Sequence, residues 1–170
     1  ASRHGTQIWF SRNGEGRGAV IEGFTITGGV GDLQEGATTD DYRLGGGILV
    51  LYCGPTIRDN FIQGNAASQG GAGIFASDVP LGPLIENNVI RLNRATSNGG
   101  GIGLEGSGVI EGNLIEGNRC DRGDGGGVWA WLPGYQISVS ILDNHIVQNV
   151  AGAHGGGVYS GPPGGQMEIA

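Results

Sequence analysis

The side chains best suited to chemistry recur at one position of the chain, directly before a cluster of glycines. Successive copies place Asn98, Asp124 and His154 there, and Arg122 precedes Asp124 by two residues. If the copies stack, a carboxylate orients a histidine beside an arginine. Such a group can abstract a proton from a uronic acid and stabilise the resulting enolate. His154, Asp124 and Arg122 are therefore candidate catalytic residues. The simpler alternative, which we favour, is a solvated loop with a surface ion pair of little energetic value.

A second group of candidates is aromatic and follows the same glycine clusters. If the first aliphatic residue after each cluster points inward, strand alternation turns the next residue outward. That outward column reads Leu49, Phe75, Gly103, Trp129 and Tyr159, with Trp131 two residues beyond Trp129. Exposed aromatics in a row can stack on sugar rings or anchor a protein partner. The candidate ligand-binding residues are Phe75, Trp129, Trp131 and Tyr159; the alternative is that loops or a neighbouring segment cover them.

Acidic side chains gather in the longest interruption of the pattern, residues 30–44. This stretch contains Asp32, Glu35, Asp40 and Asp41. Oxygen-rich loops suit Ca²⁺, so calcium is a candidate cofactor with Asp40 and Asp41 as candidate metal ligands. The ligand spacing matches no known calcium loop, and a solvated insertion is the alternative.

The elements that must position these residues are encoded by a repeat. The motif Ile-x-x-Asn-x-Ile-x-x-Asn begins at Ile57, Ile85, Ile110 and Ile141, with a degenerate copy at Ile21. It alternates with glycine clusters that are each followed by an aliphatic residue. The first asparagines of the full copies, Asn60, Asn88, Asn113 and Asn144, are separated by 28, 25 and 31 residues. A period of this length is typical of a solenoid.

The pattern within each repeat predicts strands joined by tight turns. Apolar residues come in short bursts that do not have helical spacing, and each burst ends at Asn or Gly, which tolerate left-handed backbone. We expect coils of three short strands that pair in parallel with the next coil, ~4.8 Å away. Equivalent aliphatic residues would then fill a narrow core. The fold class is all-β, a parallel β-helix of about five to six coils.

The repeated asparagines have a structural role in this interpretation. Asn60, Asn88, Asn113 and Asn144 stack at one turn, where their amides can hydrogen-bond along the axis and to turn backbone. We expect this column to satisfy polar groups inside a bend and to take no part in catalysis.

The segments Ile21–Gly29 and Pro55–Asn60, together with the Gly-Gly-Gly-Ile motif, resemble the pectin-lyase-like superfamily. They are more narrowly similar to the right-handed β-helix repeats of large bacterial secreted and surface proteins, including polymorphic outer membrane proteins and autotransporter passengers. The resemblance covers about residues 17–160 and implies a right-handed helix in a secreted or cell-surface protein. It implies no single activity, because the superfamily contains lyases, hydrolases, epimerases, adhesins and inert stalks. The chain departs from the polygalacturonases, which carry an Arg-x-Lys motif, since it has no lysine.

Composition limits the partners. The formal net charge is −7 and every basic residue is arginine, which is a poor match for nucleic acid or an anionic membrane. No apolar stretch reaches the ~18 residues of a membrane span. Cys53 and Cys120 fall at different phases of the repeat, so we expect no disulfide and two partly buried thiols.

We expect residues 1–170 to form a single β-helix domain, with residues 1–16 as an irregular first coil or cap. Ile169 falls where another Ile-x-x-Asn strand would begin and no polar cap follows, which suggests a fragment of a longer protein. The favoured function is a non-catalytic structural, adhesive or carbohydrate-binding module whose partner is a polysaccharide or a protein surface. The alternative is a polysaccharide lyase or glycoside hydrolase acting on acidic glycans. A third hypothesis is end-to-end or homo-oligomeric assembly through open coil ends.

Overall fold

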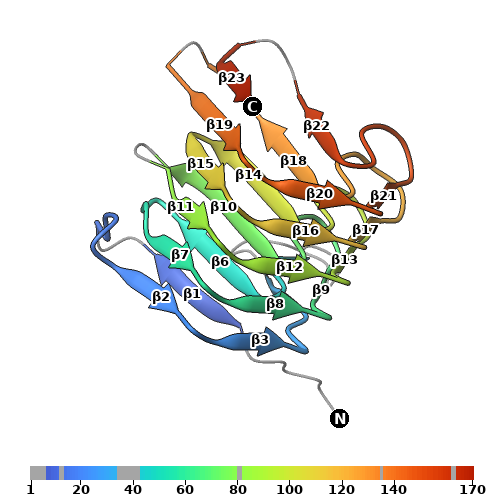
Figure 1. The fold of residues 1–170 in the computed structure, drawn as a ribbon, viewed down its shortest axis with the longest axis horizontal. Helices are drawn as coiled ribbons and strands as arrows, with labels where there is room; N and C mark the ends of the chain where they lie inside the picture. Colours follow the sequence, from blue (N-terminus) through green and yellow to red (C-terminus); the bar gives the residue numbers. More distant parts are fainter. Residues whose placement is uncertain (1–6, 12–13, 34–42, 80–81, 135, 162–163) are drawn as a thin grey trace.

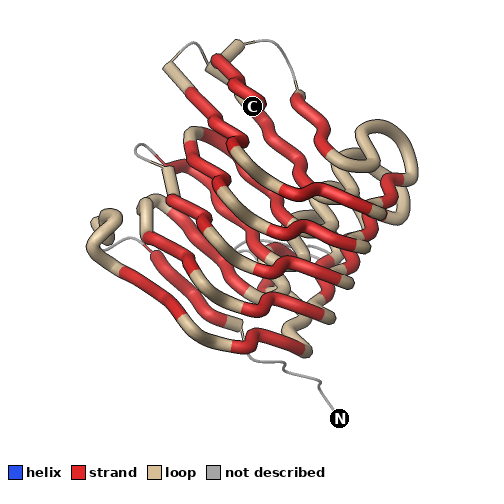
Figure 2. The backbone as a smooth tube through the Cα atoms, viewed as in Figure 1, coloured by secondary structure: helices blue, strands red, loops and turns tan. Residues whose placement is uncertain are grey.

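The chain winds into a stack of coils whose strands form four parallel sheets (Figures 1 and 2). The structure is a computed structural model that describes residues 7–11, 14–33, 43–79, 82–134, 136–161 and 164–170. Within these ranges all regular secondary structure is β-strand. The expected all-β parallel solenoid is therefore confirmed.

Two sheets contain six strands each. Sheet 1 consists of β1 (Ile8–Ser11), β6 (Ile48–Leu51), β10 (Ile74–Val79), β14 (Ile102–Gly106), β18 (Val128–Trp131) and β22 (Val158–Ser160). Sheet 2 consists of β2 (Val20–Glu22), β7 (Thr56–Arg58), β11 (Leu84–Glu86), β15 (Gly108–Glu111), β19 (Ser138–Leu142) and β23 (Gln166–Ile169).

The other two sheets are shorter. Sheet 3 consists of β3 (Thr25–Thr27), β8 (Phe61–Gln63), β12 (Val89–Arg91), β16 (Leu114–Glu116) and β20 (His145–Val147). Sheet 4 consists of β9 (Ala66–Ala67), β13 (Arg94–Ala95), β17 (Arg119–Cys120) and β21 (Val150–Ala151). A separate antiparallel pair joins β4 (Asp32–Leu33) to β5 (Arg43–Leu44).

The coil count and the strand count differ slightly from the expectation. About four turns contribute a strand to all four sheets, fewer than the expected five to six. The repeat count includes end copies that form only part of a turn. Among the described residues, β3 is followed by no sheet 4 strand, and the last two strands, β22 and β23, belong to sheets 1 and 2. Each full coil also has a fourth strand of two residues, too short for an alternating pattern to reveal.

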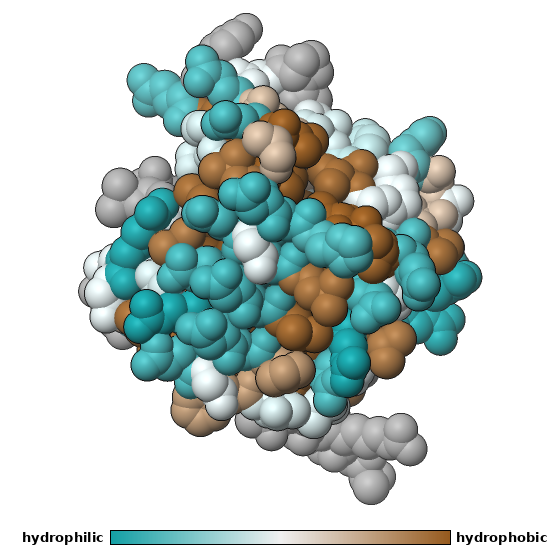
Figure 3. Space-filling model, in the orientation of Figure 1, coloured by the Kyte–Doolittle hydropathy of each residue, from teal (hydrophilic) through white to brown (hydrophobic). Residues whose placement is uncertain are grey.

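The core is a set of aliphatic columns that run along the helix axis. In sheet 3, Ile62 pairs with Ile26 and Ile90, and Ile90 pairs with Ile115. Each of these side chains is buried. Their neighbours on the strand face outward, so the outer surface mixes hydrophobic and hydrophilic side chains (Figure 3). Burial of apolar area on one face of each strand is what holds the coils together.

Two asparagine ladders form the bends on either side of sheet 3. In the first, the amide Nδ2 of Asn60 donates to Asn88 Oδ1 at 3.0 Å, and the contact repeats from Asn88 to Asn113 (3.0 Å) and from Asn113 to Asn144 (2.9 Å). The predicted stacking of these four residues is therefore present. A second ladder of the same geometry, absent from the expectations above, is formed by Asn65, Asn93, Asn118 and Asn149.

The glycine clusters, each of which directly precedes a strand of sheet 1, allow the backbones of successive coils to approach each other. A Cβ atom on Gly100 would lie 2.4 Å from the carbonyl oxygen of Gly126 in the next coil. Gly99 beside it has a φ of +63°, a backbone conformation that other residues adopt at a cost. The glycine clusters therefore mark a close backbone contact between coils that leaves no room for a side chain.

Two further expectations concern residues 1–16 and the two cysteines. Within the predicted first coil, β1 pairs in parallel with β6, which places it in sheet 1. Cys53 and Cys120 are free and buried. Cys53 belongs to the main core, whereas Cys120 lies on β17 and accepts a hydrogen bond from the amide of Gly123 at 3.3 Å.

Candidate functional site

The predicted polar column before the glycine clusters forms a hydrogen-bonded ladder. The amide of Asp124 donates to Asn98 Oδ1 at 3.2 Å, and the amide of His154 donates to Asp124 Oδ1 at 2.9 Å. The same carboxylate oxygen lies 2.9 Å from His154 Nδ1. Because successive coils stack in register, a carboxylate and an imidazole 30 residues apart are brought into direct contact.

Arg122 does not join this pair. Its backbone amide donates to Thr96 O, which fixes the loop, but within the described ranges its side chain forms no ion pair with Asp124 or His154. The His154 side chain is 77% exposed. The structure thus assembles two of the three candidate catalytic residues, on an open surface.

The aromatic column has the predicted register but not the predicted exposure. Phe75 pairs with Leu49 and Gly103, and Trp129 pairs with Gly103 and Tyr159. Phe75 and Trp129 are nevertheless buried, with 2% and 7% exposure, which corrects the expectation of an exposed row. Gly103 provides the reason: a Cβ there would lie 2.9 Å from Phe75 Cδ2, so the ring occupies the space that a side chain would fill.

The remaining aromatic residues connect to the polar pair. The Trp129 and Trp131 rings are stacked with centroids 5.8 Å apart, and the His154 and Tyr159 rings are stacked at 6.2 Å. Because Tyr159 is the register neighbour of Trp129, the two stacks are adjacent on sheet 1. We call the surface formed by Trp129, Trp131, Tyr159 and His154 the aromatic shelf. The Asp124–His154 pair therefore lies next to the aromatic column, and Tyr159 joins the two candidate groups of the sequence.

The spacing in the sequence could have predicted that the polar column and the aromatic column are adjacent. Trp129 lies five residues after Asp124, and Tyr159 lies five residues after His154. Since Asp124 and His154 occupy equivalent positions, the aromatics that follow them must occupy equivalent positions too. What the spacing could not give is the direction of each ring.

The candidate calcium ligands Asp40 and Asp41 lie outside the described residues. Across the described ranges, the structure contains no group of three or more His, Cys, Asp or Glu side chains that could hold a metal ion. The same part of the chain has no helix of the length and apolarity that crossing a membrane requires.

A second polar cluster lies on sheet 4, where β13 and β17 place two arginines side by side. Arg94 pairs with Arg119 in register. The Asp121 carboxylate accepts a hydrogen bond from the Nε–H of each, at 2.7 Å from Arg94 and 2.6 Å from Arg119. These two hydrogen bonds lower the pKa of the Asp121 carboxyl group. Sequence reasoning did not identify the cluster as a site, although each arginine directly follows an asparagine of the second ladder.

Stacked parallel coils with repeated Ile and Asn columns define a parallel β-solenoid. The family described as "Right handed beta helix region" matches residues 2–162, so the chain belongs to this family. Comparison with the curated proteins and with the solved structures finds no match.

Proposed function

We propose that this chain is a non-catalytic β-helical module that binds carbohydrate through the aromatic shelf. The observation that carries the proposal is the stack of Trp129 on Trp131 next to the stack of Tyr159 on His154. Trp131 is 38% exposed and presents an apolar surface, which suits stacking against a sugar ring. The Asp124–His154 pair, which lies against Tyr159, supplies groups that can hydrogen-bond to sugar hydroxyls.

The scaffold beneath the shelf favours binding because it is preorganised. Trp129 is buried and its strand is paired on both sides, by β14 and by β22. A rigid aromatic platform loses little side-chain entropy when a ligand binds. A β-solenoid also suits a structural or adhesive role in a secreted or cell-surface protein, a setting that rests on the resemblance of the repeats to bacterial surface β-helices.

The test is glycan-array screening followed by calorimetric titration of the best ligand. Removing the exposed ring with Trp131→Ala should weaken binding by about tenfold, which corresponds to the ~1.4 kcal/mol expected for losing an aromatic contact. Phe61→Ala is the matched control, because Phe61 is an exposed aromatic on sheet 3 and lies outside the shelf. Equal losses in both variants, or unchanged binding by Trp131→Ala, would contradict the proposal.

One observation favours a second function, a polysaccharide lyase or hydrolase acting on acidic glycans. The 2.9 Å contact between Asp124 Oδ1 and His154 Nδ1 is the geometry of a carboxylate that orients a general base. Incubation with uronate polymers, with and without calcium, would reveal a lyase as unsaturated products detected by ultraviolet absorbance. Turnover that is abolished by His154→Ala would establish this function in place of the binding module.

A further inference from the structure

Arg94 and Arg119 are held side by side although their charges repel. They are register partners on β13 and β17, which are adjacent parallel strands. Like charges directly opposite each other on neighbouring strands are destabilising. Asp121 offsets the repulsion by accepting one hydrogen bond from each guanidinium on separate carboxylate oxygens. One carboxylate therefore orients two cations.

The backbone holds this carboxylate in place. The amide of Asp121 donates to Ala95 O at 3.0 Å, and the amide of Arg122 donates to Thr96 O at 2.9 Å. Asp121 is thus tied to the preceding coil on the strand that also carries Arg94. The two arginines are therefore anchored to a rigid backbone, so less conformational entropy is lost when they bind a ligand.

Each guanidinium uses only its Nε–H in this cluster. Arg94 and Arg119 are 67% and 54% exposed, against 20% for Asp121. Their terminal NH₂ groups make no hydrogen bond to any residue that the structure describes. Both guanidinium groups therefore present unused hydrogen-bond donors to solvent. The cluster of two arginines and Asp121 has a net charge of +1.

We infer that Arg94 and Arg119 form a binding site for a tetrahedral oxyanion, a sulfate or phosphate group. Strands in a sheet are ~4.8 Å apart, a separation that one such group can bridge with different oxygens. Guanidinium groups recognise these oxygens through paired, charge-assisted hydrogen bonds. Because Asp121 already accepts from the Nε–H of both arginines, the anion would bind at their terminal NH₂ groups.

The charge of the whole chain restricts the ligand further. The cluster is positive, whereas the chain carries a formal net charge of −7. A long polyanion would be repelled by the rest of the surface, while an isolated substituent meets mainly the local field, since charges beyond ~8–10 Å are screened at physiological salt. The site therefore fits a single sulfate or phosphate substituent on an otherwise weakly charged molecule.

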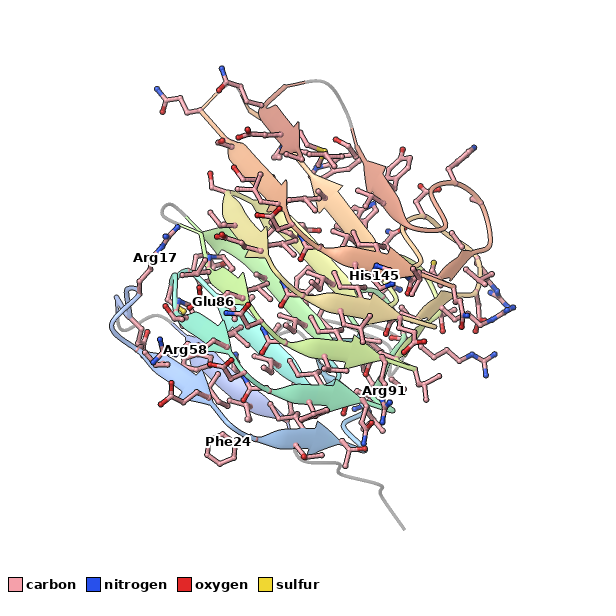
Figure 4. All side chains as sticks on the ribbon, viewed as in Figure 1. Arg17, Phe24, Arg58, Glu86, Arg91 and His145 are labelled. Carbon is pink, nitrogen blue, oxygen red and sulfur yellow. The ribbon has the colours of Figure 1, made fainter. Side chains whose placement is uncertain are left out.

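The test is an NMR titration of the arginine Nε–H signals with sodium sulfate and, separately, sodium phosphate at constant ionic strength. Saturable shifts are expected at Arg94 and Arg119, and the arm that saturates at lower concentration identifies the preferred oxyanion. Arg58 is the internal control, because it is an exposed arginine on sheet 2 bound to a single carboxylate, Glu22, at 2.6 Å (Figure 4). Linear shifts of equal size at Arg58 would overturn the inference.

Variants separate this site from the aromatic shelf. Arg94→Gln and Arg119→Gln should each weaken sulfate binding by about tenfold, whereas Arg58→Gln should leave it unchanged. Trp131→Ala should also retain sulfate binding, since Trp131 is on β18 of sheet 1 and the arginines are on β13 and β17 of sheet 4. Failure of carbohydrate binding would thus leave the oxyanion site standing, and loss of sulfate binding in Trp131→Ala would contradict it.

Discussion

Asn88 illustrates how single residues hold the bend between sheets 2 and 3. Its side-chain amide donates to Ile57 O, Glu86 O and Asn113 Oδ1, and its Oδ1 accepts from Asn60. The residue is almost fully buried and all its polar atoms have partners. A buried polar group that is fully hydrogen-bonded stabilises a turn, while one that loses its partner is costly.

Asn88→Ala should therefore lower the free energy of unfolding by about 3 kcal/mol, since it leaves several buried groups unsatisfied. Asn144→Ala is the matched comparison, because it removes the same motif position from a less buried member of the ladder. Water can replace some of its contacts, so its loss should be smaller. Urea denaturation measures both, and equal effects would show that burial does not set the value of the ladder.

We expect Asp121 to make a pH-dependent contribution to the free energy of unfolding. Its pKa is lowered by hydrogen bonds from Arg94 and Arg119, so its stabilising contribution is present above the ordinary aspartate pKa. The contribution is lost as the pH falls through the lowered pKa. Asp121→Asn should cost about 0.2–1 kcal/mol at neutral pH, the range for solvent-exposed ion pairs, and nothing in strong acid.

Denaturation at both pH values, with the carboxyl titration followed by NMR, measures this effect. Glu111→Gln is the control, because the register neighbour of Glu111 is the like-charged Glu86. Neutralising Glu111 should not destabilise the chain at neutral pH. A carboxyl titration of Asp121 at or above the ordinary aspartate value would refute the pairing.

The glycine clusters act at the level of the strands and turns. They let the backbone of one coil contact the backbone of the next just before sheet 1, which brings strands β6, β10, β14, β18 and β22 into register. The aromatic shelf depends on this register, because Tyr159 meets Trp129 only when β22 lies directly beside β18.

Gly100→Ala should destabilise the chain by about 3 kcal/mol or more, because its Cβ would lie 2.4 Å from Gly126 O and 2.6 Å from the carbonyl carbon of Arg119. Gly18→Ala provides the control: it has no atom within 4 Å of the added Cβ and no positive φ. Thermal denaturation should show a large loss for the first and almost none for the second. A tolerated Gly100→Ala would mean that the coils are less tightly stacked.

As a whole, the described residues form a one-dimensional stack in which the strands of each coil pair with those of the coils before and after it. Strands β12 and β16 have a partner on both sides, whereas β22 and β23 have one described partner each. The aliphatic columns follow the same trend, since Ile90 and Ile115 are fully buried and Ile146 is only half-buried. Stability in such arrays is approximately a sum of coil and interface contributions.

Hydrogen exchange of this chain should therefore be graded along the axis. Amides of β12 and β16 should exchange at least about tenfold more slowly than those of β22 and β23, because terminal strands open without disrupting two interfaces. Exchange measured by mass spectrometry resolves these segments. Uniform protection from β12 to β23 would indicate that the stack unfolds as one cooperative unit.

The repeat by itself determined the architecture and the first asparagine column, at the bend between sheets 2 and 3, because stacking in register turns equal spacing along the chain into neighbours in space. The same logic placed Asp124 beside His154. Only the tertiary structure decided which outward residues are exposed and which ion pairs form. Phe75 covers Gly103 and Trp129 is buried, and it is Asp121, not Arg122 with Asp124, that forms the arginine ion pairs. Those outcomes depend on side-chain direction and on the size of the residue one coil away, and a periodic pattern of residue types specifies neither.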